Sequence, residues 1–170
     1  VTAIEYIRQL CLEAIPRRYR NASPETLKQI HNRIEHELGV IQRTHSENYF
    51  LLVWDICRFA REKGIRYNGR GSGANSLVAY LLYISPVDPL QFNLVFERFL
   101  SDERQVAGDF DIDFESRRRP EIIQYIFERY GIEHAAMATT YVTYLAKSAQ
   151  RDVAKAFGIP EDVLPRLRHE

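Results

Sequence analysis

The segment from Asp109 to Phe114 constrains the fold of this chain more than any other. It alternates strictly between aspartate and a large apolar residue, in the order Asp-Phe-Asp-Ile-Asp-Phe. Side chains of a β-strand point alternately to its two faces, so the pattern predicts a strand whose acidic face is formed by Asp109, Asp111 and Asp113. The opposite face is apolar and is expected to pack into a core.

The acidic face of this predicted strand indicates a site for divalent cations. Successive carboxylates on one face of a strand lie about 7 Å apart, and like charges so placed repel one another unless a cation lies among them. Two-metal phosphoryl-transfer sites use such carboxylates to hold two hard cations roughly 3.5–4 Å apart. The alternative is a solvated acidic edge strand, and the six residues by themselves do not decide between the two.

A glycine-rich segment, Gly69 to Ser76, precedes a run of apolar residues that begins at Leu77. Glycines allow backbone N–H groups to approach an anion closely, and the start of a helix adds a favourable dipole. The segment therefore predicts a phosphate-binding loop that uses Arg70, Gly71 and Ser72. It lacks the Lys-Ser/Thr pair of a Walker A loop. A plain turn between a strand and a helix is the alternative.

A basic stripe lies near the end of the chain, where Lys147, Arg151 and Lys155 are spaced four residues apart. This spacing places the three side chains on one face of a helix, where they can follow a phosphate backbone. A solvated helix face is the alternative. The 23 basic and 23 acidic residues give a net charge of zero, so contact with a nucleic acid depends on local patches of this kind.

Composition excludes several classes of protein. Hydrophobic residues make up 45% and charged residues 27% of the chain, which is typical of a folded globular protein. Cys11 and Cys57 match no zinc or disulfide spacing, so buried reduced thiols in a cytosolic protein are expected. The sequence contains no signal peptide and no apolar run long enough to cross a membrane. Because the chain begins at Val1 without a methionine, a fragment of a longer protein is expected.

The remaining pattern is helical at first and mixed afterwards, which predicts the α/β or α+β class. Capping residues and apolar periodicity predict three N-terminal helices. The first begins at Thr2 and is ended by Pro16 and the cluster Arg17–Arg20; the others run from Ser23 to Gly39 and from about Asn48 to Gly64. Further along, strands are expected at 65–67, 109–114 and 135–141. Buried or amphipathic helices are expected at 77–84, from Pro120 to Gly131 and at about 143–157.

Four segments together resemble the palm of C-family bacterial DNA polymerases, the family of the DNA polymerase III alpha subunit. They occur in the same order as in that family: Tyr49–Asp55, Gly69–Ala74, Phe96–Leu100 and Asp109–Phe114. The resemblance implies a polymerase-beta-like nucleotidyltransferase fold. It also implies a helical N-terminal part of the palm at 1–64, a palm core at 65–141 and the start of a helical thumb at 142–170. Details around Ala74–Ser76 and Phe114–Arg119 are similar to the error-prone class of these enzymes.

The resemblance also implies roles for residues. Asp109 and Asp111 match the family's metal-binding aspartates, with Asp113 as a supporting carboxylate. Gly71 and Ser72 match its triphosphate-binding motif. Two Mg²⁺ ions, a primer–template DNA and deoxynucleoside triphosphates are the implied cofactors and substrates, and a sliding clamp is the implied partner of the full-length protein in the bacterial cytoplasm. The family needs a third catalytic aspartate beyond this chain, so the isolated chain is expected to be inactive.

Two other functions stay open at this stage. One is a different nucleotidyltransferase with the same palm, such as an RNA-tailing enzyme; the motifs Tyr49–Asp55 and Phe96–Leu100 count against it. The other is a non-catalytic module that binds metal or DNA. In such a module the carboxylate strand would have no phosphate-binding loop beside it.

Overall fold

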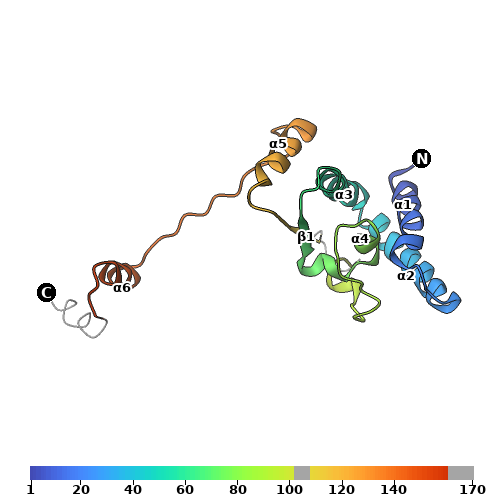
Figure 1. Ribbon diagram of the computed structural model, residues 1–170, viewed down its shortest axis with the longest axis horizontal. Coiled ribbons are helices and arrows are strands. Elements are labelled where there is room, and N and C mark those ends of the chain that lie inside the picture. Colours follow the sequence, from blue (N-terminus) through green and yellow to red (C-terminus); the bar gives the residue numbers. More distant parts are fainter. Residues whose placement is uncertain (102–107, 161–170) are drawn as a thin grey trace. The chain divides into compact units, whose positions relative to one another are not determined.

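The computed structural model describes residues 1–101 and 108–160 of the chain, in two compact units (Figure 1). The first unit runs from Val1 to Ala135 and the second begins at Ala136. The elements of the first unit are, in order, α1 (Ala3–Arg18), α2 (Pro24–Arg43), α3 (Glu47–Glu62), β1 (Tyr67–Arg70), the 3₁₀ turn η1 (Gly71–Asn75), α4 (Leu77–Leu81), the 3₁₀ turn η2 (Phe96–Arg98), β2 (Asp111–Phe114) and α5 (Arg119–Tyr130). Helices dominate this unit and its described strands form one two-stranded sheet, which confirms a mixed α and β fold.

The first two helices begin at the predicted caps, but α2 ends later than predicted. Thr2 and Glu5 form a reciprocal capping box at the start of α1, and the Ser23 hydroxyl caps α2. α1 ends at Arg18, within the predicted stop, whereas the predicted stop of α2 at Gly39 is wrong. Pro16 lies in the last turn of α1, where it removes only its own N–H bond. Gly39 lies inside α2, which continues because the next two residues, Val40 and Ile41, are buried.

The core of the first unit lies where α4 packs against α1 and α2. Every residue of α4 is buried, as predicted for this apolar run, although the helix is shorter than predicted. Cys11 and Cys57 are buried free thiols, also as predicted. The largest fully buried side chains are Phe50, Phe96, Ile7, Ile30, Ile34, Leu38, Ile41, Leu77, Leu81, Leu82, Ile84 and Leu100.

The sheet consists of β1 and β2 in antiparallel pairing. Tyr67 lies opposite Phe114, and Arg70 lies opposite Asp111. The predicted strand at 65–67 is therefore displaced, because Ile65 is buried at the end of α3 and the pairing with β2 extends into the glycine-rich segment. Hydrogen-bonded pairing also begins at Asp111 instead of the predicted Asp109. β1 runs directly into η1, so the sheet and the glycine-rich turn are continuous.

A buried carboxylate attaches α5 to α3. Asp55 on α3 is 8% exposed and accepts hydrogen bonds from Tyr125 Oη at 2.6 Å, Tyr130 Oη at 2.8 Å and Arg58 Nη2 at 2.6 Å. Burial by itself would raise the pKa of Asp55, but these hydrogen bonds outweigh it and hold the pKa below its usual range. α5 begins only five residues after β2 ends. The Asp55 cluster therefore fixes the segment that follows β2 against α3.

The change Asp55→Asn is expected to lower the free energy of unfolding of the chain by about 2–4 kcal/mol at pH 7, since the buried charged acceptor of three part-buried donors is lost. A depressed carboxyl pKa stabilises the fold above its unfolded-state pKa, and the contribution is lost as the pH falls through the lower folded-state pKa. Urea unfolding of both proteins from pH 7 to pH 3 should therefore show the difference shrinking only below about pH 4. The control is Glu62→Gln, which removes an exposed ion pair of Arg58 and should change the stability by less than about 1 kcal/mol. An equal loss in both variants would contradict the prediction.

The described part of the second unit contains one helix, α6 (Ala146–Ala156). This agrees with the helix predicted at about 143–157, and Gly158 follows it with φ of 67°. The strand predicted at 135–141 is wrong, because these residues are mostly exposed and have no strand beside them among the described residues. A strand needs a partner for its backbone groups, and periodicity alone does not supply one. None of the described helices is long and apolar enough to span a bilayer.

Candidate functional site

The two faces of the carboxylate strand separate as predicted. The side chains of Asp111 and Asp113 are 48% and 59% exposed, whereas Ile112 and Phe114 are half-buried. Asp109 lies before β2 and is exposed, and its place on the acidic face stays a prediction. The segment therefore presents its carboxylates to solvent from a backbone whose other face packs on the protein.

Phe110 anchors this segment in the core. Its ring contacts those of Phe50, Phe99 and Tyr49, with centroids 5.1 Å, 4.8 Å and 5.5 Å away. Its backbone N–H donates to Tyr49 Oη at 3.0 Å. Aromatic packing on this scale resists movement, so the carboxylates on either side of Phe110 are presented from a fixed backbone.

The glycine-rich turn η1 lies directly against the carboxylate segment. Gly71 has φ of 75° and is so close to Asp111 that an added Cβ would lie 3.0 Å from Asp111 Oδ2. An added Cβ on Gly73 would lie 2.5 Å from the ring of Phe110. Only residues without a side chain allow this approach. The structure therefore brings the glycine-rich turn and Asp111 together, and a role of the turn in phosphate binding stays a prediction.

Arg70 lies between the carboxylates of β2. Its Nη1 is 3.2 Å from Asp111 Oδ2 and its Nε is 2.9 Å from Asp113 Oδ2. The sequence predicted that this guanidinium binds a phosphate; in the structure it makes ion pairs with the strand instead. The two carboxylates thus already share one positive charge, that of the Arg70 guanidinium, which fits their use as ligands for divalent metal ions.

The start of α4, where the sequence placed a phosphate, is filled by a side chain of the protein. Ser76 caps α4, accepting from Ala79 N at 3.0 Å, and its hydroxyl donates to Glu37 Oε2 at 2.8 Å. The N–H groups of Leu77 and Val78 each donate to the Glu37 carboxylate at 3.0 Å. Any phosphate contact of the glycine segment must therefore come from η1 instead of from the α4 N-terminus.

Sequence reasoning missed Glu37, although a signal for it was present. It lies three residues after Ile34 and four before Ile41, within the apolar stripe of α2, and it is fully buried. A carboxylate at a core position needs buried donors. Burial raises the pKa of Glu37, while the hydrogen bond from Arg33 and those from the α4 backbone oppose that rise.

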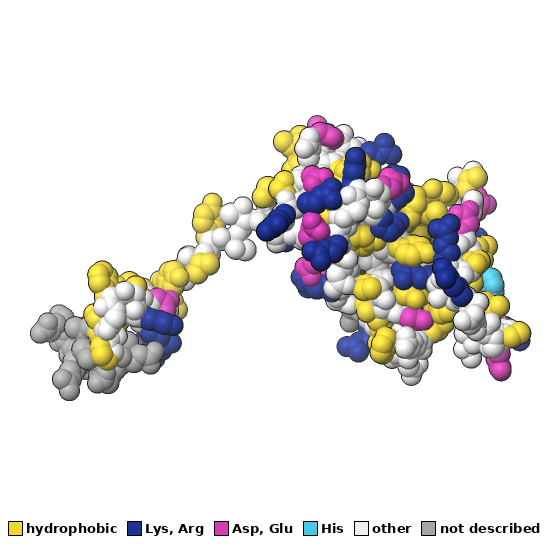
Figure 2. Space-filling view, viewed as in Figure 1, with side chains coloured by type: hydrophobic (Ala, Val, Ile, Leu, Met, Phe, Trp, Pro, Cys, Tyr) yellow, Lys and Arg dark blue, Asp and Glu magenta, His cyan; other side chains and the backbone are white. Residues whose placement is uncertain are grey.

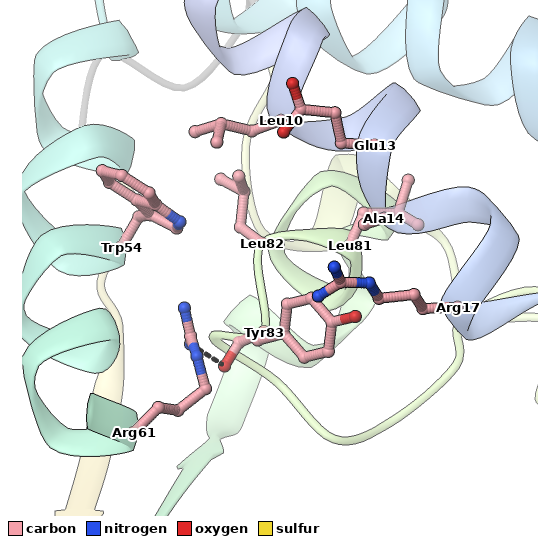
Figure 3. A pocket seen from close by; sticks show the side chains of 9 residues that line it. All are labelled: Leu10, Glu13, Ala14, Arg17, Trp54, Arg61, Leu81, Leu82 and Tyr83. Atoms are coloured by element: carbon pink, nitrogen blue, oxygen red, sulfur yellow. Dashed lines mark hydrogen bonds between the residues drawn. The ribbon is translucent and has the colours of Figure 1, made fainter. Parts of the chain in front are cut away.

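A hollow of about 500 Å³ opens beside η1. One wall is η1 itself and the other is the segment that leads into η2; its lining residues are Gly71, Ser72, Ala74, Asn75, Leu94 and Arg98. It shares Gly71 with the contact to Asp111, so it borders the carboxylate segment. A separate hollow lies between α1, α3 and the residues after α4, where Arg61 donates to the carbonyl of Tyr83 (Figure 3). Residues of the carboxylate strand and of the glycine turn do not line that second hollow.

The basic stripe lies on α6, in the second unit. Lys147, Arg151 and Lys155 are all exposed, and Figure 2 shows the Lys and Arg side chains of this unit gathered on one side of the helix. On the first unit, Lys and Arg side chains lie among Asp and Glu side chains on the face shown in Figure 2. The stripe thus has the predicted geometry, and its contact with DNA stays a prediction.

Comparison with known proteins places the chain in a family. Residues 5–170 match the family described as the bacterial DNA polymerase III alpha NTPase domain. The chain belongs to this family. An error-prone DNA polymerase of Symbiobacterium thermophilum is 49% identical over 162 residues, which is 95% of this chain and 15% of that protein. Proteins of the same name from Saccharophagus degradans and Vibrio parahaemolyticus are 46% and 47% identical, over 98% and 96% of the chain.

These relatives are much longer than the chain, which spans about 15–16% of their length. Their name agrees with the resemblance to the error-prone class noted around Ala74–Ser76 and Phe114–Arg119. The family is therefore identified, and membership of the error-prone class stays a prediction.

Proposed function

We propose that this DNA polymerase III alpha-type chain is the nucleotide-binding palm portion of a DNA-directed DNA polymerase that extends a primer 3′ end. The observation that carries the proposal is the contact between the glycine turn and the carboxylate strand, with Gly71 against Asp111. A surface for phosphates beside carboxylates for metals is the minimum that nucleotidyl transfer requires. The error-prone DNA polymerases that the chain resembles support this substrate class.

The proposed architecture follows the family. Residues 1–64 form the helical N-terminal part of the palm, residues 65–141 the palm core of the polymerase-beta-like type, and residues 142–170 the start of the thumb. In this arrangement the first unit supplies nucleotide binding and α6 supplies contact with DNA through Lys147, Arg151 and Lys155. In the full-length protein, which acts in the bacterial cytoplasm, a sliding clamp is the proposed partner.

The carboxylates fit the binding of two Mg²⁺ ions. Carboxylate oxygens are the ligands that Mg²⁺ prefers, and Asp111 is exposed, is rigidly presented and already shares a cation. We assign Asp109 and Asp111 as metal ligands and Asp113 as a supporting carboxylate. When bound, the two ions activate the attacking 3′-oxygen and neutralise charge on the departing pyrophosphate.

The chain's own residues then orient the nucleotide. Gly71 and Ser72 present backbone N–H groups and a hydroxyl to the triphosphate in the hollow beside η1, and Arg98 lies on the opposite wall. Arg70 pairs with Asp111 and Asp113; with metal ions bound at the carboxylates, its guanidinium would be free to pair with a phosphate oxygen. The chain thus binds the triphosphate between two walls and holds its reacting end beside Asp111.

Primer extension by the full-length protein tests this function. With a primer–template duplex, the four deoxynucleoside triphosphates and Mg²⁺, the expected product is extension that follows the template sequence. Extension that ignores the template would instead indicate a tailing nucleotidyltransferase. DNA binding with no extension under any metal would indicate a non-catalytic module, although the contact between Gly71 and Asp111 already counts against that alternative.

A further inference from the structure

One arginine of α2 reaches both walls of the hollow beside η1. The Nη2 of Arg33 donates to the carbonyl of Asn75, the last residue of η1, at 3.2 Å. The same nitrogen donates to the carbonyl of Leu94, on the opposite wall, at 3.1 Å. A single guanidinium nitrogen therefore connects the glycine turn to the segment that leads into η2.

The orientation of Arg33 is fixed by Glu37, one helical turn later. Arg33 Nε donates to Glu37 Oε1 at 2.7 Å, and the other contacts of this carboxylate are the hydroxyl of Ser76 and the N–H groups at the start of α4. Glu37 is fully buried, so its bonds are shielded from water and are stronger than surface bonds. Because Ser76 directly follows η1, Glu37 also fixes the end of the glycine turn.

A second connection between α2 and this region reinforces the first. His36 Nε2 lies 2.7 Å from Glu97 Oε1 on η2. Both side chains are about half exposed, so this contact is weaker than the buried pair. α2 thus holds the two walls of the hollow at a fixed spacing, and the principal contacts are those of Arg33 and Glu37.

We propose that Arg33 and Glu37 are positioning residues for the triphosphate, which set the distance between η1 and the Leu94–Arg98 wall. This inference rests on the proposed function, because it assigns the hollow to the triphosphate. Arg33 and Glu37 make their hydrogen bonds to other groups of the protein. Both residues therefore act on the triphosphate indirectly, by fixing the backbone around Asn75 and Leu94. A displacement of about 1 Å in such a wall is enough to weaken a multidentate site substantially.

The test uses Arg33→Lys in the full-length polymerase. Lysine keeps the positive charge beside Glu37, but its single ammonium cannot hold Glu37, Asn75 and Leu94 together in one plane. We expect the KM for the incoming nucleotide to rise about tenfold, kcat to change by less than about threefold and the Kd for primer–template DNA to stay within about twofold. The matched control is Arg8→Lys, which makes the same change in an ion pair with Glu35 away from the hollow and should leave the KM unchanged.

Glu37→Gln provides the second variant. The amide keeps the shape of the side chain but presents N–H groups to backbone donors, so the KM should rise at least as much as in Arg33→Lys. A melting curve shows whether this variant folds; if it does not, Arg33→Lys decides. A nucleotide KM within about twofold of wild type in the folded variants, with only kcat or the melting temperature lowered, would show a merely structural role and overturn the inference.

The wild-type protein separates this inference from the proposed function. If wild type extends primers and the nucleotide KM of the variants is unaffected, only the positioning role fails. If wild type does not extend primers, the proposed function fails, and direct titration of each protein with a deoxynucleoside triphosphate and Mg²⁺ still measures binding in the hollow. Equal affinities in wild type and Arg33→Lys would then overturn the positioning role as well.

Discussion

Asp111→Asn in the full-length polymerase is expected to lower the single-turnover rate by about a thousandfold or more. Asparagine has nearly the same size but lacks the negative charge that holds metal ions. Loss of one charged ligand weakens transition-state stabilisation by several kcal/mol, and each 1.4 kcal/mol corresponds to about tenfold in rate. The backbone of the strand should stay in place, because the Asp111 side chain faces solvent and the core contacts come from Phe110 and Ile112.

Substitutions on the carboxylate strand and on the α6 stripe should affect DNA affinity and the rate of the chemical step differently. Asp111→Asn should leave the primer–template Kd nearly unchanged, or slightly improved, because a negative charge near the phosphates has been removed. Arg151→Ala, on the exposed stripe of α6, should weaken DNA binding and reduce its salt dependence by about one charge while the chemical step is preserved. A single-turnover assay beside binding measurements across a salt series separates the two effects. Glu128→Gln, an exposed carboxylate-to-amide change on α5, is the matched control.

A near-normal single-turnover rate for Asp111→Asn, at saturating DNA and Mg²⁺, would exclude a metal-ligand role for this residue. A loss of rate that comes with unfolding or lost DNA binding would also speak against it. The contrast with Arg151→Ala therefore tests both the strand and the stripe in one set of experiments.

Local features of the fold could be predicted from the sequence because local chemistry determines them. The caps at Thr2 and Ser23 satisfy N–H groups only a few residues away, and the alternation around Asp111 needs only one buried face. Helix ends and isolated strands depend on distant partners. Gly39 lies inside a helix because Ile41 reaches the core, and residues 135–141 form no strand because none lies beside them among the described residues.

Some features of the candidate site could likewise be predicted from the sequence, and others could not. The approach of the glycine turn to Asp111 was predictable, since the order of the motifs resembles a family in which both segments contribute to one site. The ion pairs of Arg70 and the bridge made by Arg33 were not, because each joins residues about 40 or more positions apart. Glu37 was in principle visible as a carboxylate within an apolar stripe, but its partners at the start of α4 depend on how α2 packs.

The purified 170-residue chain is expected to show no template-directed primer extension, even at high enzyme and Mg²⁺ concentration. We assign Asp109 and Asp111 as the metal ligands that this chain supplies, with Asp113, which pairs with Arg70, as a supporting carboxylate. The family's third catalytic aspartate would come from the part of the polymerase that this chain, spanning about 15% of its relatives, does not include.

The expected loss of activity in the isolated chain has two causes: a missing metal ligand, and a primer end that is not held in position. Without the third carboxylate that the family resemblance implies, a metal ion held by Asp109 and Asp111 would lack one charged ligand, which by itself would cost several kcal/mol of transition-state stabilisation. Without the rest of the polymerase, the primer end is not held within about 3–3.5 Å of the α-phosphate, and up to about 7–11 kcal/mol of orientation is lost as well. The rate should therefore lie below detection in a gel-based extension assay. Extension by the purified chain that disappears in Asp109→Ala would show that this piece carries a complete catalytic site.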